Sequence, residues 1–336
     1  MTARTLVVGG DGAAPLAAAV AEVAGRLGWP LVAEASAGLG EVALPHGALL
    51  VGDLPAPEYV VVVGAPTLHR SVRELLQASA DVTVVTRSPR WPEAGGPARV
   101  VGPEWLATVD GSADPTWLAQ WRRAADRRAA HVVPIVHASW PSGLSVARTT
   151  MAALPAGAAI QLGSSNPVRD VDVAADPRAD VRVVANRGLA GIDGTLSSAV
   201  GVALVHDGPA YALVGDLTFL HDLTGLIVGP QEPAPDLTVV VVNDDGGGIF
   251  STLEQGAPEY ADRFERLFGT PTGAELAGLC AGLGVRHCLA STPEELAEAV
   301  ATVPRGVSVV EVRCRRDGLR DLHRAIRAPL DLRLDQ

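Results

Sequence analysis

The sequence predicts an α/β protein made of two doubly wound parallel-sheet domains. Three observations lead to this prediction: valine-rich runs that do not alternate with polar residues, helical patterns between these runs, and a length of 336 residues, which suits about two domains. Continuous apolar strands such as YVVVVGAP (59–66) are typical of a parallel sheet that helices cover on both faces. We therefore expect strands and helices to alternate along most of the chain.

The first third of the chain holds the first strand–helix series. Strands are expected at 5–10, 29–34, 59–66 and 81–87, and helices at about 15–27 and 71–77. Proline, glycine and tryptophan then interrupt the pattern between Ser88 and Pro115, and GSADPTW (111–117) has the form of a linker followed by an N-capped helix. We therefore predict a domain boundary near residue 110, with domains over 1–110 and 111–336.

The second domain repeats the α/β pattern. A helix is expected over 115–130, and strands are expected near 158–162, 181–185, 210–215, 237–243, 285–288 and 307–312. The sequence Thr292-Pro293-Glu294-Glu295 combines an N-cap, a proline at the first helical position and a capping-box glutamate. A helix is therefore expected to begin there.

Composition excludes several classes of function. The formal net charge is −11, lysine is absent, and the arginines form no basic stripe, which disfavours both nucleic acid and an anionic membrane surface as partners. No apolar stretch approaches the ~20 residues of a membrane helix, and the N-terminal run is too short for a signal segment, so a cytoplasmic protein is expected. The three cysteines form no CxxC pair, and no zinc site is predicted.

A glycine-rich turn, GGDGAA (9–14), follows the first strand. It lacks the full GxGxxG spacing, and no ribose-binding acid is expected at the end of the second strand. A plain turn between strand and helix is favoured over a dinucleotide site.

Acidic residues follow two strands of the second domain. Asp216 ends the strand at 210–215, Asp244 ends the strand at 237–243, and HDLTGLIVG (221–229) is the expected helical crossover between them. Both side chains should therefore meet at the carboxyl edge of the sheet, where doubly wound sheets bind ligands. Two carboxylates and a main-chain oxygen from glycines 246–248 form the hard oxygen site that Mg²⁺ uses beside a phosphate.

Gly215-Asp216, followed after about thirty residues by an Asn/Asp cluster beside glycine, resembles the thiamine diphosphate signature. The resemblance implies thiamine diphosphate and Mg²⁺, or Mn²⁺, as cofactors. It implies three metal ligands: the side chains of Asp216 and Asp244 and the carbonyl of Gly246. The family most often has asparagine as its second ligand, whereas the matching residue here is Asp244, preceded by Asn243.

Four motifs narrow the resemblance. SSNPVRD (164–170), NRGLAGIDGTLSSAVG (186–201), GDLTFLHDLTGL (215–226) and NDDGGGIF (243–250) are together similar to the synthases that make 2-succinyl-5-enolpyruvyl-6-hydroxy-3-cyclohexene-1-carboxylate (SEPHCHC) in menaquinone biosynthesis. The implied reaction is the decarboxylation of 2-oxoglutarate on thiamine diphosphate, followed by addition of the succinyl unit to isochorismate. The implied domains are a central domain, 1–110, and a diphosphate-binding domain, 111–336.

The resemblance also assigns individual residues. Arg169, Arg187 and Ser165 are expected to bind substrate, and Arg70, in GAPTLHRSV (64–72), is expected to reach it from the first domain. Ile192 is expected to hold the cofactor in its bent form, with Ile249 and Phe250 as apolar walls. The other cofactor-binding residues implied are Gly215, Asp216, Leu217, Thr218, Gly246 and Gly247.

The family's activating glutamate lies on a separate pyrimidine-binding domain. That domain is expected to be missing here, so no catalytic residue is predicted in this chain, and the isolated chain is expected to bind weakly without turnover. A homodimer or homotetramer is implied. Two alternatives stay open: a non-catalytic binding or regulatory module that keeps the cofactor cradle, and an acetolactate-synthase-like enzyme.

Overall fold

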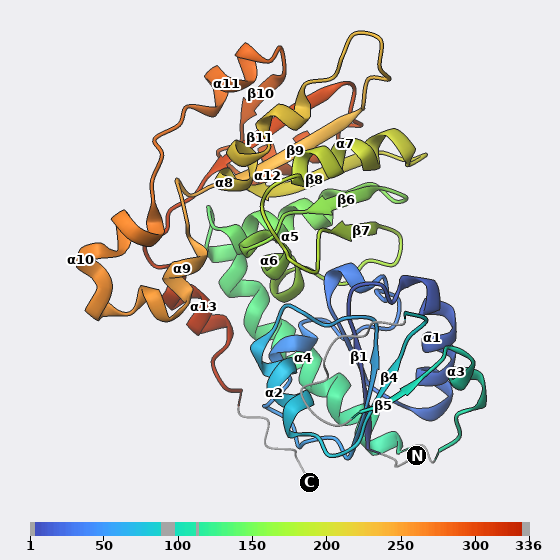
Figure 1. Ribbon diagram of the computed structural model, residues 1–336. Coiled ribbons are helices and arrows are strands. Elements are labelled where there is room, and N and C mark those ends of the chain that lie inside the picture. Colours follow the sequence, from blue (N-terminus) through green and yellow to red (C-terminus); the bar gives the residue numbers. More distant parts are fainter. Residues whose placement is uncertain (1–3, 89–97, 112–113, 331–336) are drawn as a thin grey trace. The chain divides into compact units, whose positions relative to one another are not determined.

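The computed structural model describes residues 4–88, 98–111 and 114–330, and the chain divides into two compact units (Figure 1). The first unit is Met1–Val132 with Asp176–Ala179 and Pro329–Gln336, and the second is Val133–Ala175 with Asp180–Ala328. The division falls within helix α4 (Pro115–Ala138). Each unit contains one all-parallel sheet, which confirms the predicted α/β class, while the boundary near residue 110 stays a prediction.

The first unit has a five-stranded sheet in the order β2-β1-β3-β4-β5. Its elements are β1 (Thr5–Gly9), α1 (Ala17–Leu27), β2 (Leu31–Ala33), β3 (Tyr59–Val63), α2 (Arg70–Ala78), β4 (Val82–Val85), β5 (Arg99–Val101), α3 (Glu104–Thr108) and most of α4. Successive strand residues enter different cores: Val61 packs with α1, whereas Val60 packs with Trp117 and Trp121 of α4. The strands are continuously apolar because both faces of the sheet are covered.

The turn after β1 is tied to the turn after β3, at the point where the strand order reverses. Asp11 and Ala65 exchange backbone hydrogen bonds of 3.1 and 2.8 Å. The buried carboxylate of Glu34, at the end of β2, accepts hydrogen bonds from the backbone N–H groups of Thr67 and Leu68. These contacts occupy the crevice in which such sheets bind nucleotides, which favours the interpretation of GGDGAA as a plain turn.

The second unit has a six-stranded sheet in the order β10-β11-β9-β8-β6-β7. Its elements before β9 are α5 (Gly143–Ala153), β6 (Ala159–Leu162), α6 (Asn166–Ala174), β7 (Arg182–Ala185), α7 (Thr195–Val205), β8 (Ala210–Gly215) and α8 (Asp216–His221). From there on they are β9 (Leu237–Asn243), α9 (Ile249–Thr252), α10 (Ala261–Phe264), α11 (Leu276–Gly282), β10 (Arg286–Leu289), α12 (Pro293–Ala301), β11 (Val307–Arg313) and α13 (Leu319–Ile326). All six predicted strands are confirmed, within one residue at each end.

Helices cover both faces of this sheet. Leu196 of α7, Phe219 of α8 and Cys280 of α11 share one core with alternate residues of β8, β9 and β11. Helices α5, α6 and α12 pack together, and α5 also contacts β9. Side chains alternate along β9, so odd-numbered residues such as Val241 enter the α7–α11 core and even-numbered ones point the other way.

Two local predictions need correction. The crossover helix, expected from 221, begins at Asp216 as α8, and a single 3₁₀ turn, Leu223–Leu226, follows it. The N-cap of α12 is confirmed, because the side chain of Thr292 accepts from the backbone N of Glu295 at 3.2 Å. In a capping box the carboxylate of Glu295 would accept from the backbone N of Thr292. Instead it accepts from the backbone N of Ser291, one residue earlier, at 2.6 Å.

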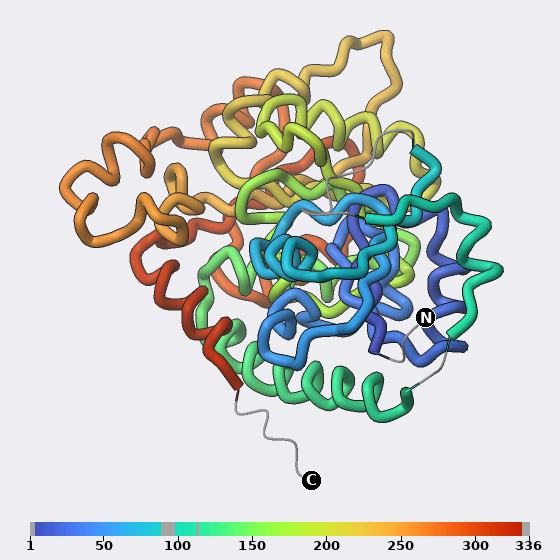
Figure 2. Tube along the Cα trace, turned by 60° about the horizontal axis from the view of Figure 1, so that its bottom comes forward, coloured from blue at the N-terminus to red at the C-terminus, as the bar shows by residue number. Residues whose placement is uncertain are grey.

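The segment between β9 and α11 is irregular. After α9 it forms short turns, α10 and a π-helical turn, Glu265–Gly269, and it runs beside α13 (Figure 2). Arg320 of α13 donates to the carbonyl of Leu253 at 2.8 Å. Within the described residues, no helix is long and apolar enough to cross a membrane.

We predict that Tyr211→Phe leaves the second unit equally stable or more stable, by up to about 1 kcal/mol. Tyr211 is fully buried in β8, burial raises the pKa of its hydroxyl, and that hydroxyl has no hydrogen-bond partner within the described residues. Urea unfolding followed by circular dichroism measures the change. Tyr59→Phe is the matched control and should be destabilising, because the Tyr59 hydroxyl lies 2.6 Å from Thr83 Oγ1. A destabilised Tyr211→Phe variant would show that a buried water satisfies the hydroxyl.

Candidate functional site

A pocket lies at the carboxyl ends of β6, β8, β9 and β11. Eleven of the predicted residues line it: Ser165, Ile192, Gly215, Asp216, Leu217, Thr218, Asp244, Gly246, Gly247, Ile249 and Phe250. The fold brings them together because β8 and β9 are parallel neighbours, with Gly215 in register with Val242. The cofactor and metal residues predicted from the sequence therefore share one pocket.

Two carboxylates, those of Asp216 and Asp244, line this pocket. Asp216 is the first residue of α8 and is 3% exposed, and Asp244 directly follows β9. Burial, opposed by backbone hydrogen bonds from Leu217 and Gly246, raises the pKa of Asp216 to about 6. Burial and then the charge of Asp216 raise the pKa of Asp244 to about 7. The charge of Asp216 thus makes ionisation of Asp244 more costly.

A divalent cation fits this donor set. Oδ2 of Asp216 has no hydrogen-bond partner within the described residues, although it is buried. A cation between two ionised carboxylates would satisfy such an oxygen and remove their repulsion. The part of the chain that the structure describes has no cluster of three or more His, Cys, Asp and Glu side chains suited to a metal, so the remaining ligands would be backbone or cofactor oxygens.

The glycines after Asp244 leave room that side chains would fill. Gly246 adopts a φ of 141°, and a Cβ at this position would overlap the carbonyl oxygen of Gly269. A Cβ on Gly248 would overlap Oδ2 of Asp244 and displace the carboxylate. The turn therefore requires glycine at 246 for its backbone conformation, and glycine at 248 so that the Asp244 carboxylate keeps its position.

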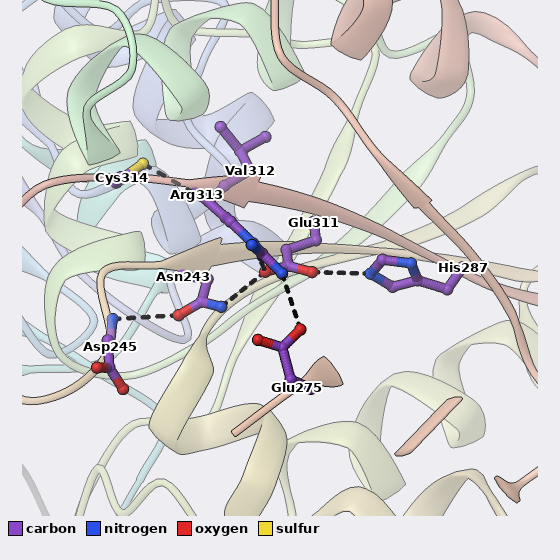
Figure 3. A network of polar contacts seen from close by, with 8 residues as sticks. All are labelled: Asn243, Asp245, Glu275, His287, Glu311, Val312, Arg313 and Cys314. Atoms are coloured by element: carbon purple, nitrogen blue, oxygen red, sulfur yellow. Dashed lines mark hydrogen bonds and ion pairs between the residues drawn. The ribbon is translucent and has the colours of Figure 1, made fainter. Parts of the chain in front are cut away.

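Asn243 is not among the residues that line the pocket, and its side chain points toward Glu311 (Figure 3). Its Nδ2 donates to Oε1 of Glu311 at 2.7 Å, and its Oδ1 accepts from the backbone N of Asp245 at 3.1 Å. Strand alternation places Asn243 and Asp244 on opposite faces. This arrangement favours Asp244 as the second metal ligand.

The three predicted arginines are not among the residues that line the pocket. Arg169 is half-buried on α6 and donates to the carbonyl of Ser165 at 2.6 Å, and Arg187 is half-buried in the loop before α7. Arg70 is the first residue of α2 in the first unit. Their predicted role in substrate binding stays a prediction.

The sequence analysis missed several residues of the pocket. Cys314 and Arg315 follow β11, and Leu319 begins α13. The rule that ligands lie at strand ends applies equally to β11, the neighbour of β9, and would have identified Cys314 and Arg315. Burial, followed by the charges of nearby carboxylates, raises the pKa of the Cys314 thiol, which therefore stays protonated.

Asp170 is a further missed residue, although it ends the quoted motif SSNPVRD. Burial and then the charge of Asp244 raise its pKa to about 8. Its Oδ1 lies 3.6 Å from Nε2 of His323. Burial lowers the pKa of His323 to about 4. At neutral pH the pair is therefore an uncharged acid beside an uncharged imidazole.

Known proteins are similar to residues 153–312 and to nearly the whole chain. Residues 153–312 match the family model described as thiamine pyrophosphate enzyme, C-terminal TPP binding domain. A SEPHCHC synthase of Saccharopolyspora erythraea is 47% identical over 97% of this chain and 59% of its own length. Synthases of the same name from Nocardia farcinica and a Nocardioides species are each 48% identical, over 98% and 97% of this chain and 59% and 63% of their own length.

Fold, pocket and family model define the class of residues 153–312, the C-terminal TPP binding domain of thiamine pyrophosphate enzymes. The relatives, 47% and 48% identical over 97% and 98% of this chain, show that the chain belongs to the SEPHCHC synthase family. The chain spans about three fifths of the length of these relatives, 59% in the first two.

We predict that Asp170→Asn stabilises the metal-free chain more at pH 8 than at pH 5. The folded pKa of Asp170, about 8, lies above its ordinary value of 3.8, so its contribution is fully present below pH 3.8 and is lost as the pH rises through 8. The loss is at most about 1.4 kcal/mol per pH unit, and asparagine removes it. Chemical unfolding of both proteins across this range provides the test. A pH-independent difference would contradict the raised pKa, and Asp172→Asn on the same helix is the control.

Proposed function

We propose that this chain is the thiamine diphosphate-binding part of a SEPHCHC synthase of menaquinone biosynthesis. The enzyme would decarboxylate 2-oxoglutarate and add the succinyl unit to isochorismate, giving SEPHCHC and CO₂. The observation that carries the proposal is the meeting of Asp216, Asp244 and Gly246 in one pocket, in a chain 47% identical to a named synthase over 97% of its length. The relatives favour this over a non-catalytic module or an acetolactate-synthase-like enzyme, because all three carry the synthase name.

Asp216, Asp244 and the carbonyl of Gly246 would hold Mg²⁺, or Mn²⁺, against the diphosphate. The raised pKa values of the two carboxylates support this role, because burial, and for Asp244 also the charge of Asp216, disfavours the ionised forms, and a bound cation would stabilise them. Gly247 lets the backbone pass close to a ligand. When bound, thiamine diphosphate supplies an electron sink for decarboxylation.

The pocket's apolar residues would exclude water from the reacting centre. Ile192, Leu217, Ile249 and Phe250 line it from three separate segments. Phe250 is held by Phe268, with ring centroids 5.7 Å apart. Excluding water would lower the local dielectric constant and so strengthen the electrostatic interactions of the polar groups in the pocket.

Arg169 and Arg187 would bind the substrate carboxylates. Both are half-buried, and each lies in a segment that also supplies a pocket residue, Ser165 for Arg169 and Ile192 for Arg187. Guanidinium groups bind carboxylates through two parallel hydrogen bonds, which suits substrates with several carboxylates. Arg70, the first residue of α2, is proposed to bind a substrate carboxylate as well.

A further domain would complete the pocket at the pyrimidine end. The pocket volume is about 190 Å³, below the ~300–1,000 Å³ of complete small-molecule sites. Its acidic residues are Asp216 and Asp244, assigned to the metal, and Asp170, beside His323. We therefore propose that the activating glutamate lies on a pyrimidine-binding domain. We also propose that the protein is a homodimer or homotetramer and that it is cytoplasmic.

We predict that Asp216→Ala abolishes Mg²⁺-dependent binding of thiamine diphosphate, because it removes a charged ligand that no neighbouring group replaces. Asp244→Asn should have a mild effect, since the amide oxygen still ligates and this is the residue the family most often uses. Calorimetric titration of each variant with thiamine diphosphate and Mg²⁺ measures both. Binding by Asp216→Ala as tight as by the unmodified chain would refute the metal assignment, and no binding by the unmodified chain at millimolar ligand would refute the proposed function.

We predict that Arg169→Ala and Arg187→Ala each lower kcat/KM for the dicarboxylate substrates by about 10- to 100-fold, the loss of one charge-assisted contact of ~1.5–3 kcal/mol. The affinity for thiamine diphosphate should stay within about twofold. The assay follows product formation in a protein that also carries the pyrimidine-binding domain. Equal losses of cofactor affinity would identify the arginine as structural. Arg182→Ala, an exposed arginine on β7, is the control.

A further inference from the structure

A carboxylate lies where the sheet would ordinarily hold an apolar residue. Glu311 is in the middle of β11, in the run VSVVEVR, and is fully buried. A buried carboxylate costs several kcal/mol unless hydrogen bonds and a counter-charge compensate it. Its presence between valines therefore requires a specific set of partners.

Three side chains donate to Glu311 (Figure 3). Asn243 Nδ2 and Arg313 Nε donate to Oε1 at 2.7 and 3.0 Å, and His287 Nε2 lies 2.9 Å from Oε2. Burial alone would raise the pKa of Glu311, but these hydrogen bonds hold it below its usual range. The carboxylate is therefore charged, and Arg313 connects it outward to Glu275 at 3.1 Å.

The hydrogen bond from Asn243 determines how its amide is oriented. With Nδ2 directed to Glu311, Oδ1 is left to accept from the backbone N of Asp245 at 3.1 Å. Without the Glu311 acceptor, only the hydrogen bond from Asp245 would distinguish the two ends of the amide, and Nδ2 would lose its partner. Glu311 therefore helps to fix the orientation of Asn243.

The backbone that Asn243 holds is the turn that carries the metal ligands. Asp245 has a φ of 52° and Gly246 a φ of 141°, so two successive residues adopt unusual backbone conformations directly after Asp244. A non-glycine residue at positive φ is unfavourable without outside support. The amide of Asn243 supplies such support from the face of the sheet opposite to the pocket.

We propose that Glu311 is a positioning residue for the cation site, acting through the amide of Asn243 on the turn that presents Asp244 and the carbonyl of Gly246. This inference rests on the proposed function. Glu311 does not line the pocket and is assigned no contact with cation, cofactor or substrate. Its effect is on the geometry of the ligands.

The test measures Mn²⁺ affinity of the 336-residue chain by electron paramagnetic resonance, with and without thiamine diphosphate. Glu311→Leu should weaken Mn²⁺ binding at least tenfold. Glu311→Gln should stay within twofold, because its amide oxygen still accepts from Asn243 and its amide NH₂ can donate to the neutral ring of His287. Glu275→Gln, at the exposed end of the same network, is the matched control and should also stay within twofold. Circular dichroism and thermal melting confirm that each variant is folded.

A double-mutant cycle tests the route through Asn243. Asn243→Ala should weaken Mn²⁺ binding about as much as Glu311→Leu, and the double variant should lose no more than the larger single loss, since both act on one turn. Unchanged affinity in Asn243→Ala would overturn the inference even if Glu311→Leu fails to fold. Where all the variants fold, additive losses would also overturn it. Unchanged affinity in a folded Glu311→Leu variant would overturn it while leaving the proposed function intact. No Mn²⁺ binding by the unmodified chain would overturn both.

Discussion

Parallel pairing of β8 with β9 forces two acidic side chains into one buried space, and much of the site depends on this constraint. Gly215 is in register with Val242, so Asp216 and Asp244 emerge at the same edge of the sheet. Burial of both carboxylates, and for Asp244 also the charge of Asp216, keeps the two pKa values well above the ordinary value of 3.8. A like-charged pair in a dry pocket is unfavourable on its own, and a divalent cation between its members reverses the sign of that interaction. This electrostatic arrangement supports the proposal of a cation site at Asp216 and Asp244.

The surroundings of Asp244 hold it from several directions. A Cβ on Gly248 would occupy the position of its carboxylate. Arg316 donates to the carbonyls of Asp245 and, at 3.2 Å, of Gly269, and its charge opposes the rise in the pKa of Asp244. The π-helical turn Glu265–Gly269 thereby supports the same backbone that Asn243 holds from the other side. A turn with two residues at positive φ is kept in place by contacts distant in the sequence, which is the usual condition for such strain to persist.

The strands and the core of the site were predictable because their signals are local. Runs of valine identify buried parallel strands, and an acid directly after such a run lies at the ligand-binding edge. Contacts between distant segments carry no comparable signal. The sequence gives no indication that α13 brings Leu319 to the pocket, that Glu34 ties down Leu68, or that Asp170 lies beside His323. These contacts depend on how segments far apart in the chain pack. The positions of Arg169, Arg187 and Arg70 outside the pocket lining depend on the same packing.

The order of Asn243 and Asp244 shows how a shift of one residue along a strand determines which side chain, amide or carboxylate, enters the pocket. In a strand, neighbouring side chains point to opposite faces, so the asparagine serves the supporting network and the aspartate serves the pocket. A carboxylate ligand brings a negative charge that an amide lacks, and with Asp216 it matches the charge of one divalent cation. It can also carry a proton: with pKa values of about 6 and 7, both carboxylates are partly protonated near neutrality. At the proposed cation site protons would therefore compete with the cation, and cation binding would release them.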